Sequence, residues 1–192
     1  MDTATRTLIE RLKRRAHDPR QTTDMADVIR SVARPPASRE LLDAAEQTLR
    51  FPLPSLLRDV YANVGNGGFG PGYGLLPVDD GVDETIVERT QTLQLPDPDD
   101  PLWRWPHGLL VVCHWGCNIY SCLDCTKPAA LVIRFDPNGH DPGTPWNDAF
   151  LTETSSFQDW LEGWLSRRPV HERFVLYPSS VWHATDGEHE SE

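Results

Sequence analysis

Four cysteines lie within thirteen residues of the chain, a spacing that could bring several thiols to one site. They follow the pattern C-x3-C-x4-C-x2-C and are Cys113, Cys117, Cys122 and Cys125. Cysteine sulfurs bind zinc and act as nucleophiles, so one hypothesis is a small zinc or thiol enzyme built on this segment. The gap of four residues between the two pairs is nevertheless shorter than the roughly twelve or more that separate the pairs of a zinc knuckle.

The residues around the cysteines predict a β-hairpin. Residues 109–113 form a continuous apolar run and are expected to be a central strand, which pairs with residues 118–124 across a turn at Trp115-Gly116. Side chains alternate between the faces of a sheet, so the first and third cysteines would lie on one face and the second and fourth on the other. We therefore expect structural cysteines, with no catalytic residue, no metal and no cofactor.

A glycine-rich segment is the second candidate for chemistry. Three of its glycines satisfy G-x-G-x-x-G, a pattern also found in dinucleotide-binding loops. Those loops leave a strand and open a helix, whereas here a predicted helix comes first and an extended segment follows. We therefore interpret the segment as a structural turn that stops a helix and starts a strand, formed by Gly65, Gly67, Gly68 and Gly70.

Charge is distributed unevenly along the chain, whose formal net charge is -11. Residues 1–39 hold nine Lys and Arg against five acids, and residues 79–101 hold eight acids against Arg89 alone. Such an acidic surface repels nucleic acid and favours basic partners, and tryptophan is enriched where proteins bind one another. We therefore predict a partner-binding surface that comprises Asp79, Asp80, Asp97, Asp99, Asp100, Trp103, Trp105 and Trp115. The alternative is that these tryptophans cap an open face of the sheet.

Helical patterns precede the strands. Apolar spacing predicts helices around residues 8–16, 25–32, 39–49, 54–64 and 83–94, an exposed loop over 95–108, and a third strand over 130–135. A last helix is expected to open at Ser155, with Gln158 completing a capping box, and to bury Trp160 and Trp164. Helices, then strands, then one helix indicate an α+β fold.

The length of 192 residues favours one domain. We expect a helical extension over residues 1–37, an α+β domain over 38–166 and a partly ordered tail over 167–192. No apolar run approaches the roughly 20 residues of a membrane span, and the N-terminus lacks the apolar core of a signal peptide. We therefore expect a cytoplasmic protein with reduced cysteines and no membrane partner.

Several motifs between about residues 38 and 166 match one known superfamily. They are Phe51-Pro52-Leu53-Pro54, Leu57, Tyr61, Asn66-Gly67-Gly68-Phe69, Tyr73-Gly74-Leu75-Leu76, Trp115-Gly116-Cys117, Phe135-Asp136, Phe157, Trp160 and Trp164. With these motifs the chain resembles the SUKH superfamily, which unites yeast cell-wall-assembly regulators, herpesvirus proteins and many bacterial toxin-immunity proteins.

The resemblance implies a fold in which helices pack beside a curved, mostly antiparallel sheet. It also implies a non-enzymatic protein-binding role, because no catalytic residues come with the superfamily. We interpret the chain as an immunity protein that covers the active site of a basic toxin, which in such systems is often a nuclease. The alternatives are a regulatory scaffold for an endogenous protein and the zinc or thiol enzyme.

Overall fold

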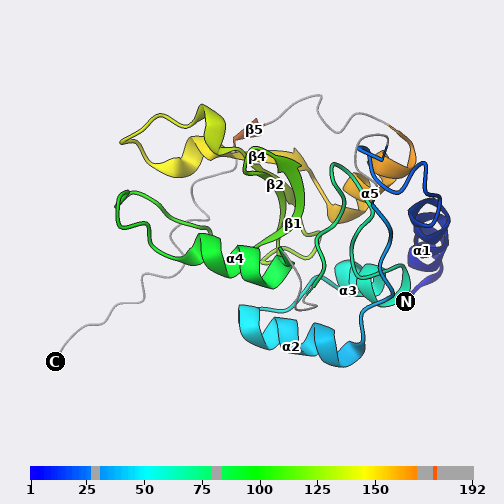
Figure 1. The fold of residues 1–192 in the computed structure, drawn as a ribbon. Coiled ribbons are helices and arrows are strands. Elements are labelled where there is room, and N and C mark those ends of the chain that lie inside the picture. Colours follow the sequence, from blue (N-terminus) through cyan, green and yellow to red (C-terminus); the bar gives the residue numbers. More distant parts are fainter. Residues whose placement is uncertain (27–30, 79–83, 168–174, 177–192) are drawn as a thin grey trace.

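The chain folds into helices and one antiparallel sheet, as the sequence predicts (Figure 1). This computed structural model describes residues 1–26, 31–78, 84–167 and 175–176. The helices are α1 (Thr3–Ala16), α2 (Arg39–Leu49), α3 (Ser55–Asn63), α4 (Ile86–Gln94) and α5 (Phe157–Leu165). The strands are β1 (Leu109–Gly116), β2 (Ile119–Asp124), β3 (Val132–Phe135), β4 (Phe150–Thr154) and β5 (Val175–Leu176), and the 3-10 helices are η1 (Pro137–Gly139) and η2 (Trp146–Ala149). The α+β fold class is confirmed.

The sheet has the order β1-β2-β3-β4-β5, so β1 is an outer strand. The prediction of a central strand over residues 109–113 was therefore wrong. The outer edge of β1 is covered instead, because the amide of Leu76 donates to the carbonyl of Val112 at 2.9 Å and the amide of Val111 donates to the hydroxyl of Thr90 at 3.0 Å. A continuous apolar run thus reports burial on both faces and does not fix the position of a strand within its sheet.

The hairpin between β1 and β2 turns two residues later than the sequence suggested. Gly116 pairs with Ile119, which leaves Cys117 and Asn118 as a two-residue turn with φ angles of 51° and 60°. Positive φ at both central residues is typical of tight hairpin turns, whose twist matches that of the strands. The predicted turn at Trp115-Gly116 was therefore wrong.

A bulge in β1 also changes which cysteines share a face. The register shifts between Val111 and Cys113, so Cys113 packs with the helices while Cys122 packs on the opposite face. Cys117 is exposed in the turn, and Cys125 contacts the same helical side as Cys113. The expected pairing of Cys113 with Cys122 on one face was wrong, because a bulge reverses the alternation on which it rested.

Side-chain caps set the starts of two helices. The hydroxyl of Ser38 accepts the amide of Leu41 at 3.1 Å at the start of α2, as its position predicted. At α5 the cap is Ser156, which accepts the amide of Asp159 at 3.0 Å. The expected capping box of Ser155 and Gln158 was therefore placed one residue too early.

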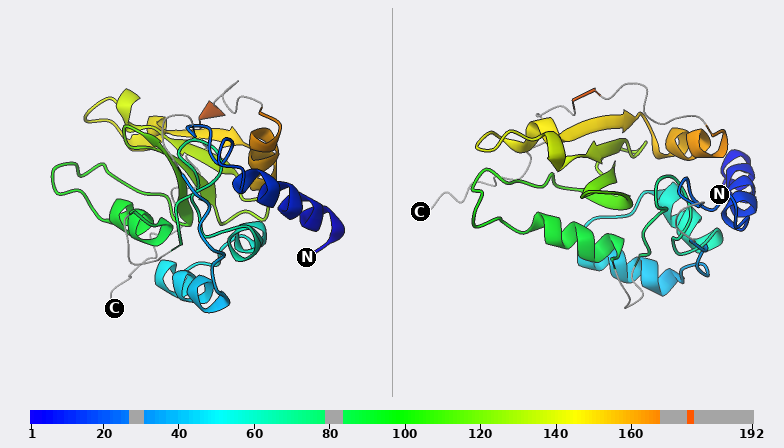
Figure 2. Two further views of the ribbon diagram at one scale, coloured as in Figure 1. Left: turned by 45° about the vertical axis from the view of Figure 1, so that its right-hand side comes forward. Right: turned by 45° about the horizontal axis from the view of Figure 1, so that its top comes forward.

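The two faces of the sheet carry separate cores (Figure 2). On the first face, the helical core joins the sheet to apolar residues from all five helices; Leu8 and Leu12 bring α1 into it, and α1 contacts α3 and α5. On the second face, the aromatic core is built on buried residues of β1–β4, with Phe135 and Phe150 at its centre.

Several predictions concern residues that the structure does not describe. Asp79 and Asp80 belong to that group, as do residues 27–30 of the helix expected over 25–32 and most of the tail. Within the tail, β5 pairs with β4, and neither strand was predicted. Over the described ranges, no helix is both long and apolar enough to cross a bilayer.

Candidate functional site

Trp103 and Trp105 pack against the sheet from the loop that connects α4 to β1. The Trp105 ring lies 5.3 Å from that of Phe135, and the Trp103 ring lies 5.9 Å from it, both edge-on. Trp146, which belongs to η2, meets Trp103 edge-on at 4.9 Å. All three tryptophans are partly buried, so they cap the second face of the sheet. The sequence left two interpretations of Trp103 and Trp105 open, an exposed pair that contacts a partner or a cap on the sheet, and their packing agrees with the cap.

Each of these indole N–H groups already has an acceptor. Trp103 donates to the carbonyls of Leu93 at 3.1 Å and Leu95 at 3.0 Å, and Trp105 donates to a carbonyl of β1 at 2.8 Å. Trp146 donates to the carboxylate of Asp100 at 2.7 Å, and this bond is the first cause of a lowered pKa for Asp100. The three rings are thus held in place by bonds that occupy their N–H groups.

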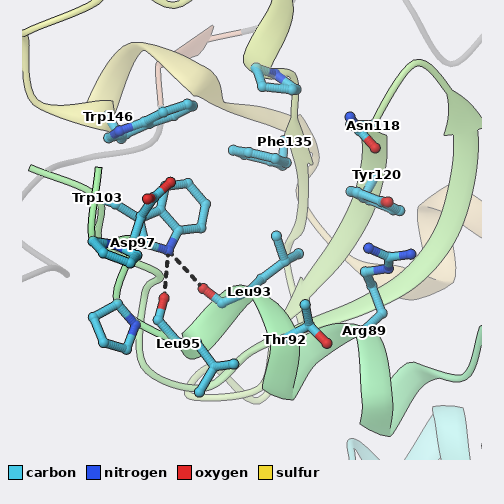
Figure 3. A pocket seen from close by; sticks show the side chains of 13 residues that line it. Arg89, Thr92, Leu93, Leu95, Asp97, Trp103, Asn118, Tyr120, Phe135 and Trp146 are labelled. Carbon is cyan, nitrogen blue, oxygen red and sulfur yellow. Dashed lines mark hydrogen bonds between the residues drawn. The ribbon is translucent and has the colours of Figure 1, made fainter. Parts of the chain in front are cut away.

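A pocket of about 440 Å³ opens between α4, the loop that follows it and the aromatic core (Figure 3). Phe135 and Tyr120 line it from the sheet, and Leu93 lines it from α4. Arg89 lies at one end of the pocket and Asp97 at the other. The remaining lining residues are Thr92, Leu95, Pro96, Pro98, Trp103, Asn118, Pro137 and Trp146. The pocket is therefore mainly aromatic and apolar, with opposite charges at its ends.

Arg89 is neutralised within the protein. It forms an ion pair with Glu84, and its guanidinium lies 5.5 Å from the centre of the Tyr120 ring. The hydroxyl of Tyr120 donates to Glu84 at 3.4 Å, and burial, with the charge of Glu84, raises the pKa of Tyr120. This end of the pocket is therefore a closed polar cluster.

The segment from β3 to β4 supplies the opposite wall, which the sequence analysis did not include. His140 stacks on Trp146 at 3.8 Å, and its Nδ1 lies 2.7 Å from a carboxylate oxygen of Asp148. Burial opposes ionisation of Asp148, but the His140 bond and charge outweigh it, so the pKa of Asp148 is lowered. Trp146, like Trp103, lies among prolines and aspartates in the sequence, and this shared context could have identified it.

The two loops that flank the pocket are acidic. Residues 95–108 contribute three aspartates against Arg104, and residues 136–149 contribute three more, so the two loops together carry a net charge of -5 with histidines neutral. Both loops project from the same side of the sheet in all views, and the bond from Trp146 to Asp100 joins them (Figures 1 and 2). We call these two loops with their pocket the acidic aromatic face.

Trp115 lies apart from this face. It packs against the helical core, where its indole donates to Ser121 at 2.8 Å and Arg134 lies 4.4 Å from its ring centre. Ser121 and Arg134 both contact the buried carboxylate of Glu153, at 2.6 and 3.0 Å, and Trp160 donates to it at 2.9 Å. The sheet thus separates Trp115, within a buried polar network, from the other proposed partner-binding residues that the structure describes.

The glycine segment runs from α3 to the edge of β1. Gly67, Gly68 and Gly70 have φ angles of 77°, 80° and 120°. A Cβ atom on Gly67 would lie 2.6 Å from the carbonyl oxygen of Leu75, so a side chain has no room there. The segment positions Leu75 and its neighbours beside β1, where they cover the outer strand.

The thiols do not gather into one site. Burial raises the pKa of the thiols of Cys113, Cys122 and Cys125, which therefore remain protonated at neutral pH and are poor nucleophiles. Across the described residues, no three His, Cys, Asp or Glu side chains converge in a way that could hold a metal ion.

Comparison with known proteins identifies a family for most of the chain. The SMI1 / KNR4 family (SUKH-1) matches residues 36–163, which confirms the SUKH resemblance. No curated protein matches the chain. The matched range includes α2 to β4, most of α5 and all residues that line the pocket.

Proposed function

The chain belongs to the SMI1 / KNR4 family (SUKH-1), whose members are generally non-enzymatic immunity or regulator proteins, and from this premise we propose that it binds and neutralises a basic protein toxin. Binding would occur on the acidic aromatic face. In this proposal the chain acts in the cytoplasm, without a cofactor, by covering the active site of its partner.

One observation carries the proposal: two acidic loops flank a pocket with aromatic walls, and one of their aspartates, Asp97, lines it. Acidic side chains around an apolar centre match the usual anatomy of a protein interface, in which a polar rim encloses buried aromatic anchors. The net charge of -5 on the two loops would attract a basic surface and speed the encounter. The aromatic rings would then slow dissociation.

The chemistry of the face supports binding rather than catalysis. The three indole N–H groups have acceptors within the protein, and Arg89 is paired with Glu84. These groups fix the shape of the pocket, which lowers the entropy lost when a partner binds. A pre-formed, acidic surface of this kind suits occlusion of a basic active site.

The test uses the toxin whose gene neighbours the gene for this chain, since an immunity gene is expected to lie beside its target. Co-expression should restore growth of cells that produce the toxin, and the purified proteins should associate more slowly as salt rises from 50 to 500 mM. Exposed charges are screened over roughly 8–10 Å at physiological ionic strength, which is the reason for the salt effect. A toxin that still kills, or that binds independently of salt, would contradict the proposal.

Charge variants locate the surface. Asp97, Asp99 and Asp141 are exposed, and their neutralisation to Asn should lower the association rate about tenfold while leaving the fold intact. Asp100 is left unchanged, because it holds Trp146. The control neutralises Glu10 on α1 and Asp2, which caps the start of that helix, at the far side of the molecule (Figure 1); it should change the rate by less than about twofold.

A further inference from the structure

We infer that the pocket beside α4 receives one arginine side chain of the partner. Its aliphatic stem would lie between Leu93 and Phe135, and its guanidinium would lie at the end formed by Trp103 and Asp97. This inference rests on the proposed function and names the group that the acidic aromatic face recognises.

The charges at the two ends give the pocket a direction. Asp97 is exposed at one end, whereas Arg89 and its ion pair with Glu84 occupy the other. A cationic head is attracted by Asp97, whereas the carboxylate at the other end already pairs with Arg89, so a long basic side chain is favoured in one orientation. A carboxylate at the mouth would instead meet the aspartates of the rim.

The walls suit a guanidinium better than an ammonium. Arginine is planar and weakly hydrated and stacks on aromatic rings, while lysine carries a compact and strongly hydrated charge. The chain makes this contact repeatedly within its own fold: Arg134 lies 4.4 Å from the centre of Trp115, and Arg15 lies 4.2 Å from that of Trp164. The pocket presents the same kind of surface, and Arg89 is the one arginine among its lining residues; Arg104 is not part of the lining, because its guanidinium donates to the carbonyls of Pro101 and Trp103 at 2.9 and 2.6 Å.

Recognition of a peptide backbone is a weaker interpretation. Grooves that bind proline-rich segments combine aromatic rings with polar groups that bond the ligand carbonyls, and tryptophan is a donor only through its N–H. Here Trp103 and Trp146 already donate to acceptors of the chain. A cation needs only ring surfaces and carboxylate oxygens, which the pocket still offers.

The test is a titration with short peptides, observed through the indole N–H signals of Trp103 and Trp146 in NMR spectra. Acetyl-Gly-Arg-Gly-amide is the probe, and the Lys and Leu versions are matched comparisons. We expect the Arg peptide to bind about fivefold more tightly than the Leu peptide, with the Lys peptide between them. Equal binding of the Arg and Leu peptides, or no binding by the Arg peptide, would overturn the inference.

Two variants distinguish direct contact between the arginine and an aspartate in the pocket from the general electrostatic attraction of the acidic aromatic face. Asp97→Asn and Asp99→Asn remove the same charge from the same loop, but only Asp97 lines the pocket. Asn at position 97 can still accept the amide of Asp99, which Asp97 now accepts at 2.9 Å, so the loop should keep its shape. We expect about a fivefold loss of Arg-peptide affinity for Asp97→Asn and less than a twofold loss for Asp99→Asn. Equal losses would overturn the inference.

The peptide titration does not require the toxin, so the two proposals can fail separately. If the toxin binds with the expected salt dependence but the Arg peptide does not bind, the arginine anchor is wrong and the proposed function stands. If the peptide binds as expected but the toxin still kills, the anchor stands and the proposed function is wrong.

Discussion

The two faces of the sheet use tryptophan in different ways. On the helical face, Trp160 and Trp164 come from α5 and are 0% and 1% exposed. On the other face, Trp103, Trp105 and Trp146 come from loops, remain partly exposed and leave a pocket beside them. A helix repeats its side chains along one stripe and can fill a core, whereas loops place single rings that cover a surface incompletely.

The faces also differ in where their charges lie. The helical face encloses Glu153, which contacts Arg134, Ser121 and Trp160, so its charged groups serve the fold. On the acidic aromatic face, Asp97, Asp99 and Asp141 are exposed. We therefore expect substitutions of charged residues on the first face to change stability and substitutions of charged residues on the second to change binding.

The largest effect is expected for Glu153→Ala. The change leaves the guanidinium of Arg134 buried without its carboxylate and removes the acceptor of Trp160, so the free energy of unfolding should fall by about 3–5 kcal/mol. Urea denaturation measures the loss. The double variant Glu153→Leu with Arg134→Met should recover much of it, because no buried charge then lacks a partner. A single variant of native stability would show that this face does not depend on the network.

Trp105→Ala should have the next largest effect and sharpens the contrast between the faces. The ring packs on Phe135 and Phe150 at 5.3 and 5.5 Å, so its loss should lower the free energy of unfolding by about 2–3 kcal/mol. The sequence predicted a partner contact for this residue, with a cap on an open face of the sheet as the alternative. Thermal denaturation with a matched Trp105→Phe control measures the packing term, and unchanged stability of the Ala variant would show that Trp105 is not part of the core.

Gly67→Val tests the segment that covers the edge of β1. The residue has a φ of 77°, and a Cβ would meet the backbone of Leu75 at 2.6 Å, so we expect a loss of about 2–3 kcal/mol. Gly139→Val is a matched control, because a Cβ there meets no atom within 4 Å. Equal free energies of unfolding for the two variants would contradict the argument that the nearby backbone of Leu75 excludes a side chain at Gly67.

Acid should loosen the contact between Asp100 and Trp146. Hydrogen bonding to Trp146 lowers the pKa of Asp100 below its usual 3.8, so its contribution is complete above that value and is lost as the pH falls through the lowered pKa. The indole N–H signal of Trp146 should therefore shift in that window. Asp100→Asn should remove most of the shift of Trp146, and a persistent shift would assign it to another group.

Regular patterns made part of the fold predictable. The spacing of Phe157, Trp160 and Trp164 predicted α5 and its burial, and Ser38 predicted the start of α2. The hairpin was predicted, but its turn was placed too early, because Trp115-Gly116 resembles a turn sequence. The two register shifts of β1, at Val111/Cys113 and His114/Gly116, cannot be recognised from the sequence. Bulges and sheet order depend on packing between segments that are distant in the chain.

The candidate site was predictable only in part. Charge and composition identified Asp97 and Trp103, which line the pocket, but not its opposite wall, Trp146 and Phe135. The contact between residues 95–108 and 136–149 depends on how the sheet folds both loops to one side, which no local pattern encodes. Trp115 was grouped with the other tryptophans because the sequence placed it in the turn, whereas it belongs to β1.

The smallest effect is expected at the turn that joins β1 and β2. Cys117 has a φ of 51°, a conformation that asparagine tolerates better than cysteine, while its neighbour Asn118 lines the pocket. Cys117→Asn should therefore raise the free energy of unfolding by about 0.5 kcal/mol and leave toxin binding unchanged. Differential scanning calorimetry and the binding assay measure the two quantities, and Cys117→Val, which resists positive φ, is the destabilising control. A Cys117→Asn variant that lost activity or a bound metal would instead revive the zinc or thiol enzyme, because this exposed thiol is the one best placed to react with a ligand from solution.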